Sequence, residues 1–365
     1  MFKRKLIAAG LLATAVSNVH ALPYGFYDAR SVAMGNVSMA TGGITTAALS
    51  NPGMLAVNES DDGVALLLPA IGVQAIDDGN VVDLVDEFQA TSDPFRQVEI
   101  LNELDGASLV AAVVPNAAFV YSGDSFTWGI ALRGTGVISA ALTDIDTTIP
   151  PAPNTNNVTA LGVGIQEIGI PLGSDFKISG IQVSVGITPR YVQVDSIEYK
   201  ESIQTADIDD ILDTDSEDLG SFTTVDAGIT INLIDTFRVG LVAKNLIEET
   251  KTTTLGNDVV FDTHYRVGAA VDLGVVTLAA DMDLTERDPI AFENPSKSLS
   301  VGAEIDAFKV VQLRAGYQTN LADNATDPDL LSLGVGIWLG FHLDIAAVVG
   351  EDSSYGAFLQ TGFHF

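Results

Sequence analysis

The sequence predicts an all-β protein, a transmembrane antiparallel β-barrel of about 14 strands. Three observations predict it: an export leader, period-two alternation along the chain, and short turns that alternate with long links. The composition agrees, because 47% hydrophobic residues and a mean hydropathy of +0.30 accompany a net charge of −31. A barrel reconciles these values, since its outer face meets lipid while its charges occupy the lumen and loops.

The N-terminus has the three-part order of a secretory signal peptide. Lys3, Arg4 and Lys5 precede an apolar run over residues 6–16, and Ala21 offers a small residue for cleavage. This order is typical of an export leader, and the run is shorter than the ~20 residues that span a bilayer. We therefore expect residues 1–21 to be a cleaved signal peptide; the alternative is an ordinary N-terminal helix.

The strands are predicted from alternation. In residues 331–340, Leu331, Leu333 and Val335 share one face, with Ser332 and Gly334 on the other. A helix would scatter these residues around its axis, so a half-apolar strand is predicted. The same analysis predicts strands near 63–74, 108–121, 125–139, 161–172, 177–194, 221–233, 236–246, 261–272, 274–284, 297–306, 309–319, 330–339, 341–350 and 355–365.

The links between these strands alternate in length. Tight turns are predicted at 122–124, 173–175, 235–236, 273–274, 307–308 and 339–340. The intervening links are mostly longer and polar. Outer-membrane barrels are built with short periplasmic turns and long extracellular loops, so this parity predicts that both barrel ends of the chain are periplasmic.

The last strand carries a second signature of such barrels. Tyr355, Phe363 and Phe365 share its outward face, and Phe365 ends the chain. This pattern resembles the signal that the outer-membrane insertion machinery reads. The alternative is an ordinary amphipathic strand that ends in Phe.

Charged residues on the opposite face define the predicted lumen, because a charge on the lipid face costs ~2–4 kcal/mol at mid-depth for Arg or Lys. They either line a polar path or form an internal salt-bridge network that holds a plugged barrel together, and we favour the network. These residues are Arg238, Lys244, Arg266, Asp272, Asp281, Asp283, Glu304, Arg314 and Asp344.

Several function classes are excluded or disfavoured. The absence of Cys excludes disulfides and thiolate metal sites. Removing the leader takes the net charge from −31 to −34, which opposes nucleic-acid binding. The remaining histidines, His264, His342 and His364, lie on separate strands, and no nucleophile elbow, zincin or Walker motif occurs. We expect no enzyme activity, no cofactor and no metal site.

Residues 75–107, between the first two strands, have a different periodicity. Val81, Leu84 and Phe88 recur at helical spacing, and Leu101 and Leu104 follow Pro94 in the same way. We expect two short amphipathic helices in this extracellular loop. Their apolar face either binds a hydrophobic ligand or a partner, or caps the barrel mouth.

Residues 29–55 carry a family resemblance. The small, Gly-rich stretch contains Met34 and Gly35 and ends in Asn51-Pro52. It resembles the N-terminal plug of FadL-like channels for hydrophobic compounds, with Gly53 in place of the family's Ala. Residues 239–246, 301–304 and 313–317 resemble a related branch, the conjugal-transfer TraF-like outer-membrane proteins.

The resemblance implies a 14-strand barrel (residues 63–365) closed by an N-terminal periplasmic hatch (residues 22–62), with Met34, Gly35, Asn51 and Pro52 in that hatch. It implies passive passage of hydrophobic or amphipathic small molecules, through the barrel or sideways through its wall. The alternative is a non-transporting component of a conjugal-transfer or secretion assembly. Expected partners are outer-membrane lipid and lipopolysaccharide, the outer-membrane assembly machinery and a hydrophobic ligand.

Overall fold

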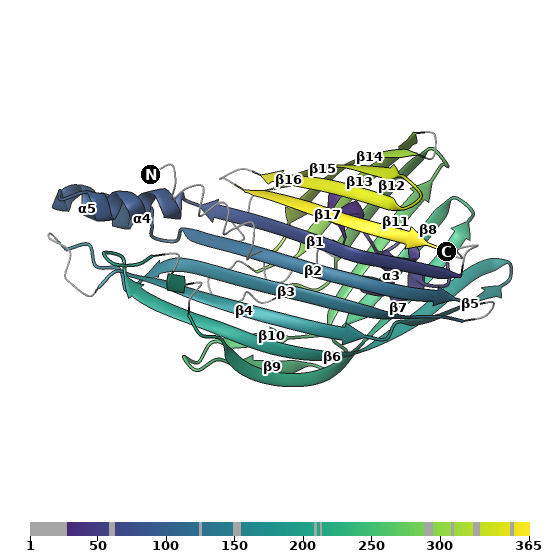
Figure 1. Cartoon of the computed structure of the whole chain (residues 1–365), viewed down its shortest axis with the longest axis horizontal. Helices are drawn as coiled ribbons and strands as arrows, with labels where there is room; N and C mark the ends of the chain where they lie inside the picture. The colour runs from purple at the N-terminus through teal and green to yellow at the C-terminus, as the bar shows by residue number, and fades with distance from the viewer. Residues whose placement is uncertain are drawn as a thin grey trace.

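The chain forms a closed antiparallel barrel in a computed structural model (Figure 1). The structure describes residues 28–57, 63–123, 126–148, 155–207, 210–211, 214–287, 295–307, 310–323, 329–350 and 354–365. The predicted signal peptide, residues 1–21, lies outside the described residues.

Fourteen strand positions make up the barrel over the described ranges. The sheet contains 15 strands, but β4 and β5 lie end to end between β3 and β6 and share one position. The strands are β1 (Val64–Asp78), β2 (Ser108–Ser122), β3 (Thr127–Thr143), β4 (Asn157–Gly169), β5 (Leu172–Ile178), β6 (Ile181–Ser202), β7 (Glu217–Ile234), β8 (Phe237–Lys244), β11 (His264–Asp272), β12 (Val276–Asp283), β13 (Ser298–Ala307), β14 (Val311–Asn320), β15 (Leu330–Trp338), β16 (His342–Gly350) and β17 (Tyr355–His364). The predicted all-β fold, antiparallel pairing and strand number are confirmed.

The first and last strands close the barrel. β1 pairs with β17 from Ala65 opposite His364 to Ala75 opposite Tyr355, and β1 also pairs with β2. All neighbouring strands are antiparallel, as an up-and-down connection by hairpins requires.

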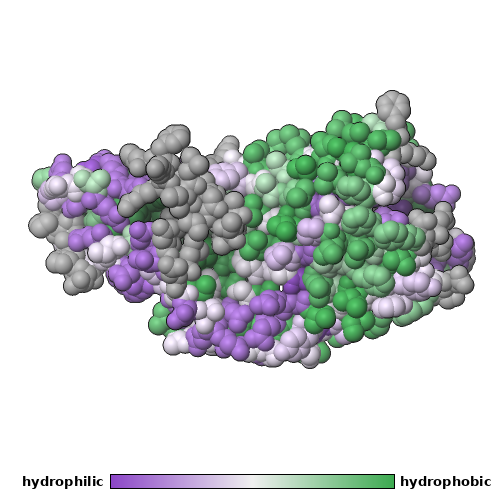
Figure 2. Space-filling view, in the orientation of Figure 1, coloured by the Kyte–Doolittle hydropathy of each residue, from purple (hydrophilic) through white to green (hydrophobic). Residues whose placement is uncertain are grey.

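Alternation along each strand separates an outer from an inner face. In β14, Leu313 is 50% exposed whereas its neighbour Arg314 is 6% exposed. Figure 2 shows hydrophobic residues gathered over the strands and hydrophilic residues around the helices at one end. The outer face is therefore apolar and the charged residues lie on the inner face, the distribution of a membrane barrel.

Long links gather at one end of the barrel and tight turns at the other (Figure 1). The long-link end carries α4 (Val81–Ala90) and α5 (Pro94–Glu103), where helical spacing predicts two helices, and the separate hairpin β9 (Glu249–Thr252) and β10 (Asp258–Phe261). Among the described residues, no helix is long and apolar enough to cross a membrane.

One predicted turn is wrong. Gly173, Ser174 and Asp175 lie inside β5, and the hairpin turns instead at Ser179-Gly180. Both turn residues have positive φ, 51° and 88°, the geometry of a two-residue hairpin loop. Pro171 accounts for the error: it interrupts the strand between β4 and β5, because it has no N–H for the ladder, and thereby imitates a strand end.

An N-terminal segment, residues 28–57, lies against the inner faces of the strands. It contains α2 (Ala29–Ala33), α3 (Ile44–Leu49) and the 3-10 helix η1 (Pro52–Met54). Asp28 caps α2 by accepting a hydrogen bond from the Ser31 backbone N–H, and Asn51 caps η1 through the Gly53 N–H. Apolar residues of α3 and η1 form one core with residues of β1, β2, β3 and β8.

Candidate functional site

The β2–β3 ladder is interrupted in the barrel wall, whereas the β3–β4 ladder beside it is continuous. Pro115 on β2 cannot donate to the ladder, and the pairing of β2 with β3 passes from Val113 opposite Gly136 directly to Asn116 opposite Arg133. Gly134, on the outward side of β3, contributes no side chain here. The ring of Pro115 lies beside Gly134, where an added Cβ would be 2.8 Å from the Pro115 Cγ.

A pocket of about 410 Å³ opens at this interruption. Its lining consists of Pro115, Leu132, Arg133, Gly134, Gln166, Glu167, Ile168, Tyr191 and Gln193. Leu132, Ile168 and Tyr191 are each 47% exposed on the outer face. Arg133 and Glu167 belong to the inward-facing set. The pocket therefore joins an apolar outer rim to a charged inner floor.

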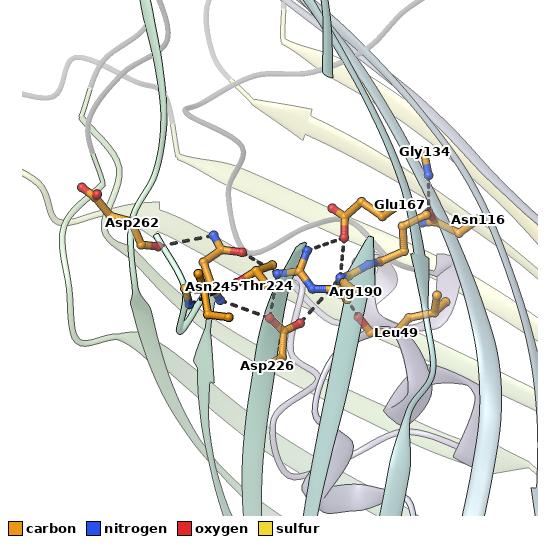
Figure 3. Close-up of polar contacts among 11 residues, drawn as sticks. Leu49, Asn116, Gly134, Glu167, Arg190, Thr224, Asp226, Asn245 and Asp262 are labelled. Carbon is orange, nitrogen blue, oxygen red and sulfur yellow. Dashed lines mark hydrogen bonds and ion pairs between the residues drawn. The ribbon is translucent and has the colours of Figure 1, made fainter. Parts of the chain in front are cut away.

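That floor is part of a buried ion cluster, which we call the wall cluster: Arg133, Glu167, Arg190 and Asp226 (Figure 3). Glu167 pairs with Arg133 at 2.6 Å and with Arg190 at 2.5 Å, and Asp226 pairs with Arg190 at 2.7 Å. Asn245 also accepts from Arg190. Two positive and two negative charges balance, which a buried cluster requires.

The wall cluster was not predicted. Its four members lie on β3, β4, β6 and β7, and only the strand register makes them neighbours. The sequence does show one ionisable residue at an inward position in the middle of each of these strands. A buried charge is strongly destabilising unless it is paired, so these residues could have been expected to pair with each other.

On the loop side of this cluster the inner wall is apolar. Leu161, Val163 and Ile165 on β4 join Val192 and Val194 on β6 in one buried cluster. The β9–β10 hairpin covers it through Val259 and Phe261, and the rings of Phe261 and Phe222 lie 4.8 Å apart.

Two further ion clusters contain most of the predicted lumen charges. In the first, Arg266 pairs with Asp283 at 3.1 Å and lies 3.6 Å from Asp281, and all three are essentially fully buried. This cluster also binds the N-terminal segment. Arg266 donates to the Asn36 carbonyl at 3.0 Å, and Asp281 accepts from the Ser38 N–H at 2.7 Å.

The second cluster joins Glu304 on β13, Arg314 on β14 and Asp344 on β16, across the intervening strand β15. Arg314 contacts Glu304 at 2.6 Å and Asp344 at 2.5 Å, and Glu304 also pairs at 2.9 Å with Arg30 of the N-terminal segment. The charges thus form ion pairs with each other and with the N-terminal segment.

The three other predicted lumen residues lie on β8 and β11. Lys244 is buried on β8, and Arg238 is half-buried on the same strand. Asp272 is exposed at the end of β11, where its carboxylate accepts a hydrogen bond from the Gly274 N–H in the turn.

The residues predicted for the hatch are all buried. Asn51 is 0% exposed, and its side-chain amide donates to the Met39 carbonyl at 2.6 Å. Met34 and Gly35 pack against β13 and β14, and Pro52 packs against β6.

The residues predicted for the insertion signal lie on or next to β17. Tyr355 and Phe365 are 56% and 66% exposed. The rings of Phe363 and Phe365 are 6.3 Å apart and nearly parallel, and Phe363 also stacks on Phe341.

Comparison with known families decides the family of this chain. The model of the family TraF_2, described as "F plasmid transfer operon, TraF, protein", matches residues 48–283, which is more than half of the chain. The chain belongs to the TraF_2 family. The comparison with curated protein sequences gave no match.

Solved structures share the fold of this TraF_2 member. A TodX monoaromatic hydrocarbon channel with the deltaS2S3 mutation matches with a TM-score of 0.59 and 13% identity, over 93% of this chain and 99% of that one. The Ralstonia pickettii toluene transporter TbuX matches with a TM-score of 0.56 and 12% identity, over 93% and 98%. A Pseudomonas aeruginosa FadL homologue matches with a TM-score of 0.52 and 11% identity, over 95% and 98%. The fold resemblance predicted from residues 29–55 is confirmed.

Proposed function

We propose that this protein lies in the outer membrane, exported by residues 1–21, and gives passive passage to hydrophobic or amphipathic small molecules. The observation that carries the proposal is the wall pocket, which is lined by mainly apolar residues of the outer face and by Arg133 and Glu167 of the inner face. The hydrocarbon and toluene transporters of the same fold support it. Burial of an apolar ligand supplies the driving force, at ~25 cal/mol per Å².

Two routes through such a barrel compete. One route runs along the barrel past the N-terminal segment, which acts as a hatch and opens by a shift near Asn51-Pro52. That shift would break the hydrogen bonds from Asn51 to Met39 and Thr230, both buried. The other route leaves sideways through the pocket, where the β2–β3 ladder is already interrupted at Pro115. We favour the sideways route because it leaves the segment in place.

Dye uptake by intact cells tests this proposal. The probe is N-phenylnaphthylamine, which intact lipopolysaccharide excludes and which fluoresces in apolar surroundings. We expect faster uptake with the protein than without it, and slower uptake when Ile168→Trp fills the pocket. The matched control is Leu333→Trp, on the outer face of β15 with a similar exposure of 55%. Equal uptake by all strains would contradict the proposal, provided that the parent and variant proteins are present in equal folded amounts.

A second candidate is a non-transporting component of a conjugal-transfer or secretion assembly. The family description, which names a transfer operon, favours it. Cross-linking in cells followed by co-purification tests it. A stable envelope partner, together with no effect of the protein on dye uptake, would favour this candidate over the channel.

A further inference from the structure

The N-terminal segment contacts every strand position of the barrel. α2 packs against β14, β15, β16, β17 and β1, α3 packs against β1, β2 and β3, and η1 packs against β5, β6, β7 and β8. The stretch between α2 and α3 supplies the remaining contacts. Asn36 binds Arg266 of β11, Ser38 binds Asp281 of β12, and Met34 packs on Gly302 of β13. A plug that fills only one part of a pore would not need contacts with every strand position.

Glycines on the inner wall leave room for this segment, whose nearest atom to an added Cβ is backbone at Gly186, Gly240, Gly302 and Gly316 but belongs to the side chain of Asn51 at Gly228 and of Met39 at Gly268. We call six of them the glycine belt: Gly186, Gly228, Gly240, Gly268, Gly302 and Gly316. A Cβ at Gly316 would lie 1.9 Å from the Gly35 nitrogen, and one at Gly240 would lie 2.0 Å from the Met39 oxygen. No side chain fits at such distances, so backbone meets backbone.

The belt is continuous across neighbouring strands in three places. Gly186 lies opposite Gly228, Gly240 opposite Gly268, and Gly302 opposite Gly316. Fourteen strands enclose an interior too wide for wall side chains to fill, and paired glycines widen it further. The wall alone therefore lacks a core at this level.

The segment lacks a core of its own as well. α2 has 5 residues and α3 has 6, far below the ~12–15 residues at which an isolated helix becomes even marginal. Yet Met34, Met39 and Leu55 are 0% exposed in the barrel. Wall and segment bury each other's surface, and neither has a packed interior without the other.

The segment also bridges the seam where the barrel closes. The Ala29 N–H donates to Gln360 of β17, the last strand, at 2.7 Å. Further along the segment, α3 packs against β1 and β2. Because the segment precedes β1 in the chain, it is present before β1 and β17 meet.

We infer that residues 28–57 are the folding scaffold on which the barrel closes. The ion pairs from Arg30 to Glu304 and the hydrogen bond from Arg266 to Asn36 then form together with the strand ladder. This role concerns assembly and does not depend on transport.

Refolding of the mature chain from urea into detergent micelles tests the inference, since no export or insertion machinery takes part. The folded barrel is measured as the heat-modifiable band on gels and by its strand circular dichroism. We expect deletion of residues 29–55 to lower the folded yield at least tenfold. Gly228→Val and Gly316→Val should do the same in the full-length chain.

Matched controls are Gly136→Val and Gly164→Val, at outward positions where the nearest atoms to an added Cβ lie 3.5 Å and 3.8 Å away. These variants should fold like the parent. A deletion variant that refolds with the parent's yield and strand content overturns the inference. If the glycine-belt variants fold as well as the controls, the inference is also overturned, even if the deletion variant does not fold. A transport defect without a folding defect would contradict the scaffold and leave the proposed channel standing.

Discussion

Arg133 of the barrel wall donates a hydrogen bond from Nη1 to the Leu49 carbonyl of the N-terminal segment, over 3.0 Å. Its Nη2 pairs with Glu167 at 2.6 Å, beside the wall pocket. One side chain thus links the segment, the ion cluster and the pocket. Displacement of either partner would be transmitted to the other through this guanidinium.

Replacing Arg133 by Met tests how much this link stabilises the barrel. Arg133→Met leaves the Leu49 carbonyl without this donor and removes one of two positive charges from the wall cluster. Breaking a buried pair typically costs ~3–5 kcal/mol, so the midpoint of urea unfolding in vesicles should fall. Lys177→Met, at an exposed position of β5, should leave it nearly unchanged. Equal midpoints for the two variants would show that the link is not stabilising.

A second prediction concerns Arg266, which is 0% exposed between two aspartates. Arg266→Met leaves the charges of Asp281 and Asp283 without their arginine and should destabilise the barrel by ~3–5 kcal/mol in urea unfolding. Adding Asp283→Asn removes one of those charges and should recover part of the loss. Such coupling between neighbours is read from a double-mutant cycle.

The control for this cycle is Arg96→Met on α5. Arg96 pairs with Glu87, Glu99 and Glu103 on the surface, where ion pairs contribute only ~0–1 kcal/mol. Hydrogen bonding to Arg96 lowers the pKa of Glu87, whose side chain is exposed. If Asp283→Asn makes the Arg266 variant less stable still, the electrostatic explanation is wrong.

The β9–β10 hairpin should detach from the inner wall in Phe261→Ala. Phe261 packs on Phe222 at 4.8 Å between centroids and belongs to the apolar cluster of β4 and β6. Removing a buried Phe costs ~3–5 kcal/mol, enough to open a hairpin of two four-residue strands. Amide exchange over residues 249–261 should accelerate, and binding of a hydrophobic dye should rise. Val260→Ala, on the exposed face of the same strand, should change neither; similar exchange in both variants would refute the packing role of Phe261.

The sequence predicted those features that depend on local alternation. Arg314 is predicted on the inward face from alternation alone, and in the structure it is 6% exposed beside Leu313 at 50%. Contacts that depend on how strands far apart in the sequence pair with each other could not be predicted. Glu167 and Arg190 are 23 residues apart, and a one-residue error in register would place them on opposite faces. The turn at Ser179-Gly180 was missed because Pro171 interrupts a strand in the manner of a strand end.

Loss of Phe365 should impair assembly in cells more than stability in vitro. Phe365 is 66% exposed and its ring lies against Phe363, so Phe365→Ala removes little packing and keeps the two backbone hydrogen bonds between Phe365 and Val64. If the terminal aromatic is read by the insertion machinery, the Phe365→Ala variant should refold from urea like the parent. In cells its heat-modifiable fraction should fall several-fold. Leu359→Ala, at another exposed position of β17, controls for general damage to the strand. A parallel loss in both assays would make Phe365 a stabilising residue and would remove the support for a recognition signal.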